Sequence, residues 1–312
     1  MTSARMPDFN KPPIYLQPDH LADYLSSQQE YCLFLDIDGT LADFTLNPKD
    51  SFIPQNTLTL LQKIQRYGGY IAVVTGRSLA EAKQMLAPLQ LPIAATHGLE
   101  MSFVNPKDNG DSQGSEPIIA SPVDSDELNT IKQALFQACQ PYDDFTIEEK
   151  NYSVALHYRQ NPALTDIAHT IVSELIADYS KWGLKPGKYV WEVAPKGVNK
   201  GTAILTLLEK TQSSSAYNGA LYPIFIGDDL TDEAGFAAVQ GEENSLKNSK
   251  EEQRRASKGI GIKVGREPTC AHYYVYTVYE VIALLESFLN FYKRRAFAAS
   301  GLADANPPLY KP

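Results

Sequence analysis

Short apolar runs alternate with segments of helical periodicity over the first hundred residues of the chain. The runs at 31–37, 70–74 and 93–96 are almost continuously apolar, which is typical of strands buried on both faces of a parallel sheet. The first helix is expected to begin at Pro54 and to stop before Gly68, and the next covers 79–86 with Ser78 as its cap. This β-α-β-α-β order predicts an α/β fold with a doubly wound parallel sheet.

The pattern changes after residue 100. A polar loop at 105–117 is followed by elements that alternate in blocks of helices and of paired strands. We expect helices at 126–140 and 163–179, strands at 145–150 and 152–159, and a strand pair around Leu184 and 189–193. Adjacent strands joined by short turns indicate an antiparallel sheet covered on one face by helices. We therefore predict an inserted α+β domain over 101–195.

Parallel-sheet order returns in the last third of the chain. Helices are expected at 201–210, 232–239 and 278–292, with strands at 222–226 and 259–264. The predicted core is thus made of 30–100 and 196–297, preceded by a loosely held lead-in at 1–29 and followed by a flexible tail at 298–312. The highly charged stretch 241–258 is expected to be a solvated surface insertion.

Composition narrows the classes of partner. With 312 residues, 43% hydrophobic and 21% charged, the chain resembles ordinary globular proteins. The net charge of −9 argues against a nucleic acid or an anionic membrane as the main partner. Three distant cysteines without metal-ligand spacing are typical of a reducing compartment, and no apolar run reaches 18 residues. We expect a cytoplasmic protein, for which an anionic small substrate stays possible if a few cations or a metal converge locally.

Polar residues follow the ends of several predicted strands or begin the following helix. They are Asp36, Asp38, Thr75, Lys200, Asp228, Asp229 and Asp232, and Gly76, which follows Thr75, is expected to bind phosphate with Thr75 and Lys200. In an open α/β sheet, ligands bind at the carboxyl ends of the strands, so these side chains are expected to share one crevice. The simpler interpretation of Asp36 and Asp38 alone is a strand that ends in an Asp-Gly turn.

Such a set suits phosphoryl transfer. One aspartate can act as a nucleophile and a second can exchange protons with the leaving alkoxide and with water. Closely spaced carboxylates need a cation, and Mg²⁺ held by Asp36, Asp228 and the carbonyl of Asp38 would supply it. Lys200 and Thr75 would bind the remaining phosphate oxygens.

The segments DIDGT, VVTGR, GVNKG and IGDDLTDE resemble, in order and spacing, the four motifs of the haloacid dehalogenase-like phosphohydrolase superfamily. The resemblance covers about 30–295 and implies a Rossmann-like core with an inserted cap domain. It implies that Asp36 is the nucleophile and Asp38 the general acid and base. It also implies that Thr75 and Lys200 bind phosphate, that Asp228 binds Mg²⁺, and that Asp229 and Asp232 are supporting acids.

GDDLTDE, together with HGLE at 97–100, more narrowly resembles the trehalose-6-phosphate phosphatase family. That resemblance implies hydrolysis of trehalose 6-phosphate through an aspartyl-phosphate, in trehalose biosynthesis. It also implies that the cap contacts the sugar hydroxyls or the phosphate through Glu148, Lys150, Arg159, Lys188 and Glu192. The second motif reads TGR where many relatives have SGR, and the insertion at 241–258 is not part of the family pattern.

Structural roles stand beside these functional ones. His97 would serve as a hydrogen-bond partner, His157 and Trp191 as packing residues, Arg77 as the partner of a carboxylate, and Lys188 and Glu192 as an ion pair.

Two other functions remain open. One is a phosphatase for another sugar phosphate, such as sucrose phosphate or mannosyl-phosphoglycerate; the other is a non-catalytic sugar-phosphate sensor. Contact with a trehalose-6-phosphate synthase is a further possibility.

Overall fold

The computed structural model describes residues 12–45, 47–103, 118–119, 123–213, 221–241 and 259–299. The expected loop at 105–117, nearly all of the charged insertion and the tail beyond residue 299 lie outside these residues. None of the described helices is both long and apolar enough to cross a membrane.

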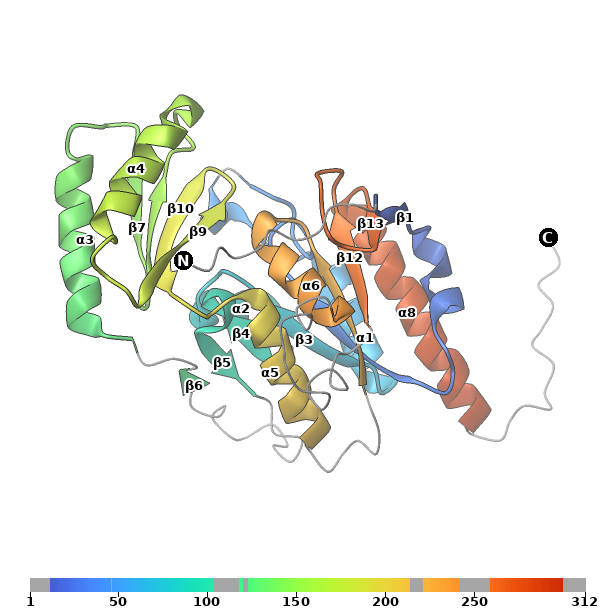
Figure 1. Cartoon of the computed structure of the whole chain (residues 1–312). Helices are drawn as coiled ribbons and strands as arrows, with labels where there is room; N and C mark the ends of the chain where they lie inside the picture. The colour runs from blue at the N-terminus through green and yellow to red at the C-terminus, as the bar shows by residue number, and fades with distance from the viewer. Residues whose placement is uncertain are drawn as a thin grey trace.

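The larger part of the chain is built on one nine-stranded sheet (Figure 1). Its strand order is β1-β13-β12-β11-β2-β3-β4-β5-β6, and every pair from β1 to β4 is parallel. At its centre β2 (Glu30–Leu35) lies between β11 (Leu221–Gly227) and β3 (Tyr70–Val74), with β4 (Ile93–Ala95) and β12 (Ile260–Val264) outside them. The predicted doubly wound parallel sheet is confirmed.

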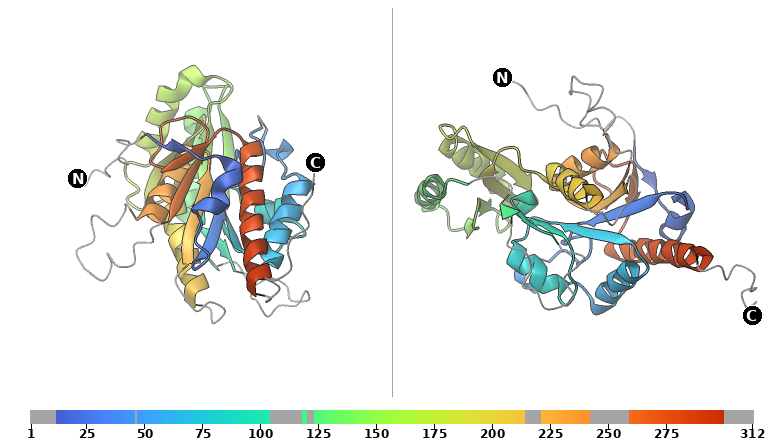
Figure 2. Two further views of the ribbon diagram at one scale, coloured as in Figure 1. Left: turned by 90° about the vertical axis from the view of Figure 1, so that its right-hand side faces the viewer. Right: turned by 90° about the horizontal axis from the view of Figure 1, so that it is seen from below.

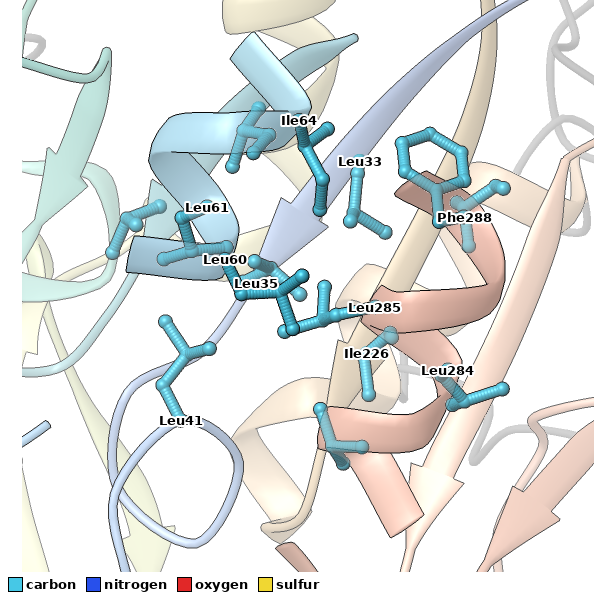
Figure 3. Packing of buried hydrophobic residues seen from close by; sticks show 14 of the residues in the cluster. Leu33, Leu35, Leu41, Leu60, Leu61, Ile64, Ile226, Leu284, Leu285 and Phe288 are labelled. Atoms are coloured by element: carbon cyan, nitrogen blue, oxygen red, sulfur yellow. The ribbon is translucent and has the colours of Figure 1, made fainter. Parts of the chain in front are cut away.

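Helices cover both faces of this sheet, as the view from below in Figure 2 shows. One face carries α1 (Gln55–Arg66), α2 (Leu79–Leu86) and α8 (Val278–Ala299), and the other carries α5 (Lys200–Ser213) and α6 (Glu233–Gln240). The central strands are buried from both sides, which is why their sequences are apolar without alternation. Figure 3 shows the first face, where α1 and α8 pack side chains such as Leu61 and Leu285 against Leu35 of β2.

Local sequence signals explain where several helices begin. Pro54 precedes α1, and Ser78 caps α2 in a capping box in which its hydroxyl accepts from the amide of Glu81. α8 continues to Ala299, beyond the predicted end at residue 292, so the predicted tail at 298–312 begins two residues too early.

The lead-in is packed where the structure describes it, so our expectation of a loosely held segment is wrong there. β1 (Ile14–Tyr15) pairs with β13 (Tyr273–Val275), and the 3-10 helix η1 (Pro18–Tyr24) lies against α8, as both views of Figure 2 show. Leu16 and Leu21 are each only 1% exposed. Burial of these leucines offsets the entropy lost by ordering the segment.

A second, four-stranded antiparallel sheet of order β7-β8-β10-β9 forms the smaller part of the molecule (Figure 1, left). Its strands are β7 (Thr146–Glu149), β8 (Val154–His157), β9 (Trp182–Gly187) and β10 (Val190–Pro195). The helices α3 (Ser125–Cys139) and α4 (Thr165–Leu175) pack on it around an apolar core of their own, which includes Trp182 and Trp191. The α+β character of this segment and the packing role of Trp191 are as predicted.

The predicted boundary at residue 101 needs correction. β5 (Glu100–Ser102) and β6 (Ile118–Ile119) are antiparallel strands at the edge of the larger sheet, although we assigned residues 101–119 to the inserted domain. Three-residue and two-residue strands carry too little hydrophobic pattern to be assigned from sequence.

Candidate active site

The carboxyl ends of the central strands bring together four predicted residues. Asp36 follows β2, Asp228 follows β11, and Lys200 begins α5. The Nζ of Lys200 lies 3.0 Å from Oδ1 of Asp36 and 2.6 Å from Oδ1 of Asp232. Carboxylate oxygens of Asp36, Asp228 and Asp232 all lie within 4.8 Å of one another.

The electrostatics of this cluster are dominated by burial and by the repulsion of like charges. Burial, followed by the charges of Asp232 and Asp228, raises the pKa of Asp36 well above its ordinary range although Lys200 opposes the shift. Burial and Asp232 raise the pKa of Asp228 to about 7. Lys200 forms ion pairs with two of the three carboxylates, Asp36 and Asp232, and no ion pair of this kind reaches the carboxylate of Asp228 among the described residues.

The backbone of Gly39 lies close to the carboxylate of Asp228. Gly39 adopts a φ of +78°, and a Cβ at this position would lie 2.0 Å from Oδ2 of Asp228. Only glycine suits both requirements. The backbone of the same loop is fixed by Asp232, whose Oδ2 accepts from the amides of Asp228 and Asp229 at 3.0 and 2.9 Å. The ammonium of Lys263 donates to the carbonyl of Asp228.

Asp38 lies outside the three-carboxylate cluster. Arg77 binds it through two hydrogen bonds, from Nε at 2.7 Å and from Nη2 at 2.6 Å, and the hydroxyl of Ser51 donates to Oδ1 at 3.1 Å. The expectation that Arg77 pairs with a carboxylate is confirmed. Two N–H groups in a planar fork fix the orientation of the Asp38 carboxylate as well as its charge.

The end of β3 supplies the next side of the site. The hydroxyl of Thr75 is buried and accepts from the amide of Arg77 at 3.2 Å. A Cβ at Gly76 would lie 2.8 Å from Cε1 of His97, so the imidazole packs directly on the backbone there.

His97 also joins the two domains. Its Nε2 lies 3.2 Å from Oε2 of Glu192 on β10 in a buried hydrogen bond. Oε1 of Glu192 accepts from Lys150 at 3.2 Å and from Ser153 at 2.6 Å. Burial raises the pKa of Glu192, but Lys150 and His97 outweigh it and hold the pKa well below its ordinary value. The hydrogen-bonding role predicted for His97 is confirmed.

Two expectations about the inserted domain need correction or refinement. His157 is not simply a packing residue, because its Nε2 lies 2.8 Å from Oε2 of Glu148, and this contact lowers the pKa of Glu148. The suggested ion pair between Lys188 and Glu192 is wrong. Glu192 binds Lys150 instead, and the ammonium of Lys188 lies 4.6 Å from the centre of the Phe44 ring.

Most of the predicted residues line a single cavity of about 450 Å³ between the two sheets. From the larger domain it is lined by Asp36, Asp38, Thr75, Gly76, Lys200, Asp228 and Asp229, and from the smaller by Glu148, Lys150, Lys188 and Glu192. Asp232 is buried behind Lys200, and Arg159 lies over the Phe44 ring at 5.0 Å, so neither lines the cavity. Its volume is within the range typical of small-molecule sites.

Comparison with known proteins identifies the family. The trehalose-phosphatase family matches residues 34–277, which is most of the chain. The chain belongs to the trehalose-phosphatase family. It is 31% identical over 259 residues to the trehalose-6-phosphate phosphatase of Escherichia coli K12, covering 82% of this chain and 86% of that protein.

Solved structures show the same fold at lower identity. The C-terminal domain of the Candida albicans trehalose-6-phosphate phosphatase superposes with a TM-score of 0.70 at 21% identity, covering 91% of this chain and 98% of that one. The C-terminal domain of the Candida albicans trehalose synthase regulatory protein gives a TM-score of 0.63 at 12% identity, covering 88% and 99%. A Rossmann-like core with a cap is therefore the fold of this trehalose-phosphatase family member.

Phe44 and Lys185 are among the residues at the cavity of this trehalose-phosphatase family member that sequence reasoning missed. Phe44, from the loop after the first motif, lies under Lys188 and Arg159 of the other domain. Lys185 on β9 lines the cavity and pairs across the hairpin with Glu192. The period-two spacing of 185 and 187 is visible in sequence, but the register that places Lys185 opposite Glu192 is not.

Proposed function

We propose that this protein hydrolyses trehalose 6-phosphate to trehalose and phosphate. The observation that carries the proposal is the shared cavity, in which the carboxylates and Lys200 of the core face the polar side chains of the four-stranded domain. The match over most of the chain to the family, and the activity named for its Escherichia coli relative, support the same substrate.

The chemistry would proceed in two displacements. The carboxylate of Asp36 attacks the phosphorus, the bond to the sugar oxygen breaks, and an aspartyl-phosphate forms. Asp38 gives a proton to the departing alkoxide and then takes one from the water that hydrolyses the aspartyl-phosphate. The Arg77 fork keeps the Asp38 carboxylate in place before the reaction.

The phosphate would be held by Thr75, the backbone at Gly76 and Lys200. All three line the cavity, and the Lys200 ammonium already lies 3.0 Å from the nucleophilic carboxylate. A fixed ammonium stabilises the charge that develops on the equatorial phosphate oxygens.

A divalent cation fits the donor set. The oxygens of Asp36 and Asp228 are hard ligands, and burial together with the neighbouring carboxylates raises the pKa of both groups, an effect that a bound cation would offset. We propose that Asp36, Asp228 and the carbonyl of Asp38 hold Mg²⁺, which would keep the nucleophile ionised and offset the charge of the phosphate. Asp232, bound to Lys200 and two amides, would orient this set together with Asp229.

The four-stranded domain would act as the cap that recognises the sugar. Glu148, Lys150, Lys188 and Glu192 present charged donors and acceptors to the cavity, and such groups suit sugar hydroxyls. We keep Arg159 in this set at the rim, where its guanidinium lies over Phe44.

A non-catalytic sensor is the second candidate, because the same fold occurs in a regulatory protein. Fold alone therefore does not decide between catalysis and sensing. Asp36 and Asp38 favour catalysis, since a sensor needs neither a nucleophile nor a proton donor.

The test is phosphate release from trehalose 6-phosphate, sucrose 6-phosphate, mannosyl-3-phosphoglycerate and glucose 6-phosphate. We would assay the wild type with Mg²⁺ and with EDTA, together with Asp36→Asn and, as a control on an exposed position, Lys181→Met. We expect preferred release from trehalose 6-phosphate that disappears in EDTA and in Asp36→Asn. Preference for another ester would refute the substrate, and no release from any ester would favour the sensor.

A further inference from the structure

Lys185 is the cavity residue whose environment the proposed function leaves unexplained. It lies on β9 directly opposite Glu192 of β10, and its side chain lines the cavity shared by the two domains. Its Nζ is buried and has no hydrogen-bond partner among the residues that the structure describes.

The neighbouring acceptors are already occupied. Oε1 of Glu192 binds Lys150 and Ser153, and Oε2 binds His97, so the carboxylate opposite Lys185 is committed elsewhere. Burial is the largest effect on the Lys185 ammonium and lowers its pKa to about 8, although the charge of Glu192 opposes this. A buried ammonium without an acceptor is unfavourable, and such groups are rare in folded proteins.

We propose that Lys185 is a sugar-recognition residue that donates a hydrogen bond to a hydroxyl of the bound sugar. The inference rests on the proposed function and adds to it a residue that determines specificity. A sugar hydroxyl is the chemistry that fits, because the proposed phosphate ligands Lys200 and Thr75 belong to the larger domain, whereas Lys185 lies on β9 of the smaller one. The substrate would then supply the acceptor that the protein does not.

The location of Lys185 also separates its role from catalysis. It belongs to the small domain, and its ammonium has no hydrogen bond to the carboxylates of Asp36, Asp228 or Asp232. Its loss should therefore weaken the binding of the sugar and leave the reaction of the phosphate group unchanged.

The experiment compares Lys185→Met, which keeps the length of the side chain, with Lys185→Gln, which restores a donor. The control is Lys181→Met, on an exposed lysine outside the cavity. Each protein is assayed with trehalose 6-phosphate and with p-nitrophenyl phosphate, which has no sugar. Inhibition of p-nitrophenyl phosphate hydrolysis by trehalose gives a second measure of sugar binding.

For Lys185→Met we expect kcat/KM for trehalose 6-phosphate to fall about 10- to 100-fold, mainly through KM, as for loss of a hydrogen bond to a charged group. The inhibition constant of trehalose should rise by a similar factor, Lys185→Gln should recover part of both, and hydrolysis of p-nitrophenyl phosphate should stay within about twofold.

Two results would overturn the role of Lys185: an equal loss with both esters, which indicates a structural role, or no loss with either. If the wild type itself does not hydrolyse trehalose 6-phosphate, the proposed function fails first. The same comparison is then made with the ester that the wild type prefers, so the two failures are distinguishable.

Discussion

Replacing Lys185 by methionine should stabilise the protein at neutral pH. The lysine side chain is largely buried and its ammonium has no hydrogen-bond partner among the described residues. Methionine has a similar length and fills the same space without a charge. The substitution therefore removes the cost of desolvating the ammonium and keeps most of the packing.

The size of the expected stabilisation follows from the pKa of Lys185. Burial lowers the pKa of Lys185 from an ordinary value of 10.5 to about 8. Each pKa unit corresponds to about 1.4 kcal/mol, so the charged lysine costs at most about 3 kcal/mol at pH 7. For a chain of this length that corresponds to a rise in Tm of roughly 5 °C.

The stability advantage of Lys185→Met over the wild type should decrease as the pH rises. Below pH 8 the lysine is charged in both the folded and the unfolded chain, so the full cost applies. Between pH 8 and 10.5 the folded state releases the proton and the unfolded state keeps it, so the wild type gains stability as the pH rises. The advantage of Lys185→Met should shrink from about 3 kcal/mol at pH 7 to about 2 kcal/mol at pH 9.

Urea unfolding followed by tryptophan fluorescence suits this test. The chain contains two tryptophans, Trp182 and Trp191, and both belong to the hairpin that carries Lys185. Lys181→Met, at an exposed turn position directly before β9, should change the stability by less than about 0.5 kcal/mol at either pH. A Lys185→Met protein that is less stable than the wild type, or a difference that does not change with pH, would refute the assignment of a buried, unpaired ammonium.

Two further substitutions test the packing around the cavity, one within the larger domain and one between the domains. Gly76→Ala would place a Cβ 2.8 Å from the His97 ring. We therefore expect loss of most activity toward trehalose 6-phosphate and p-nitrophenyl phosphate alike. Full activity toward both esters would contradict the close packing. Phe44→Leu removes the ring that lies 4.6 Å from Lys188 and 5.0 Å from Arg159. We expect KM for trehalose 6-phosphate to rise about 2- to 10-fold with little change for p-nitrophenyl phosphate, and an unchanged KM would show that these cation–π contacts do not support the cap.

The core could be predicted from sequence because its pattern is local. Each central strand is an apolar run that ends in polar residues, and neighbouring parallel strands meet at the same edge of the sheet. The proximity of Asp36, Lys200 and Asp228 therefore followed from strand order. The short strands β1, β5, β6 and β13 carry no comparable pattern, which is why the packed lead-in and the boundary near residue 101 were not predicted.

Contacts between the domains depend on registers that the sequence does not contain. The motifs pointed to Glu192 as a sugar ligand, but its bond to His97 links residues 95 positions apart. No sequence pattern singled out Lys185, and only the β9-β10 register places it opposite an already occupied carboxylate. A shift of one residue would have turned its side chain to the other face of the sheet.

Lys185 and the aspartate cluster both carry incompletely paired buried charge, and both lie at the same cavity. Buried charges in proteins are normally paired, yet the core side of the cavity clusters three carboxylates of which Lys200 pairs with two, and on the cap side the ammonium of Lys185 lacks an acceptor among the described residues. A cost near 3 kcal/mol is a large part of the 5–15 kcal/mol by which folded proteins are stable, so selection for stability alone would remove Lys185. Residues that conflict with the rest of a well-packed fold are expected where a ligand completes the interactions. A bound cation would neutralise the carboxylates of the core, and a sugar hydroxyl would accept the hydrogen bond of Lys185. Lys185→Met should therefore raise the stability of the protein and lower its kcat/KM for trehalose 6-phosphate.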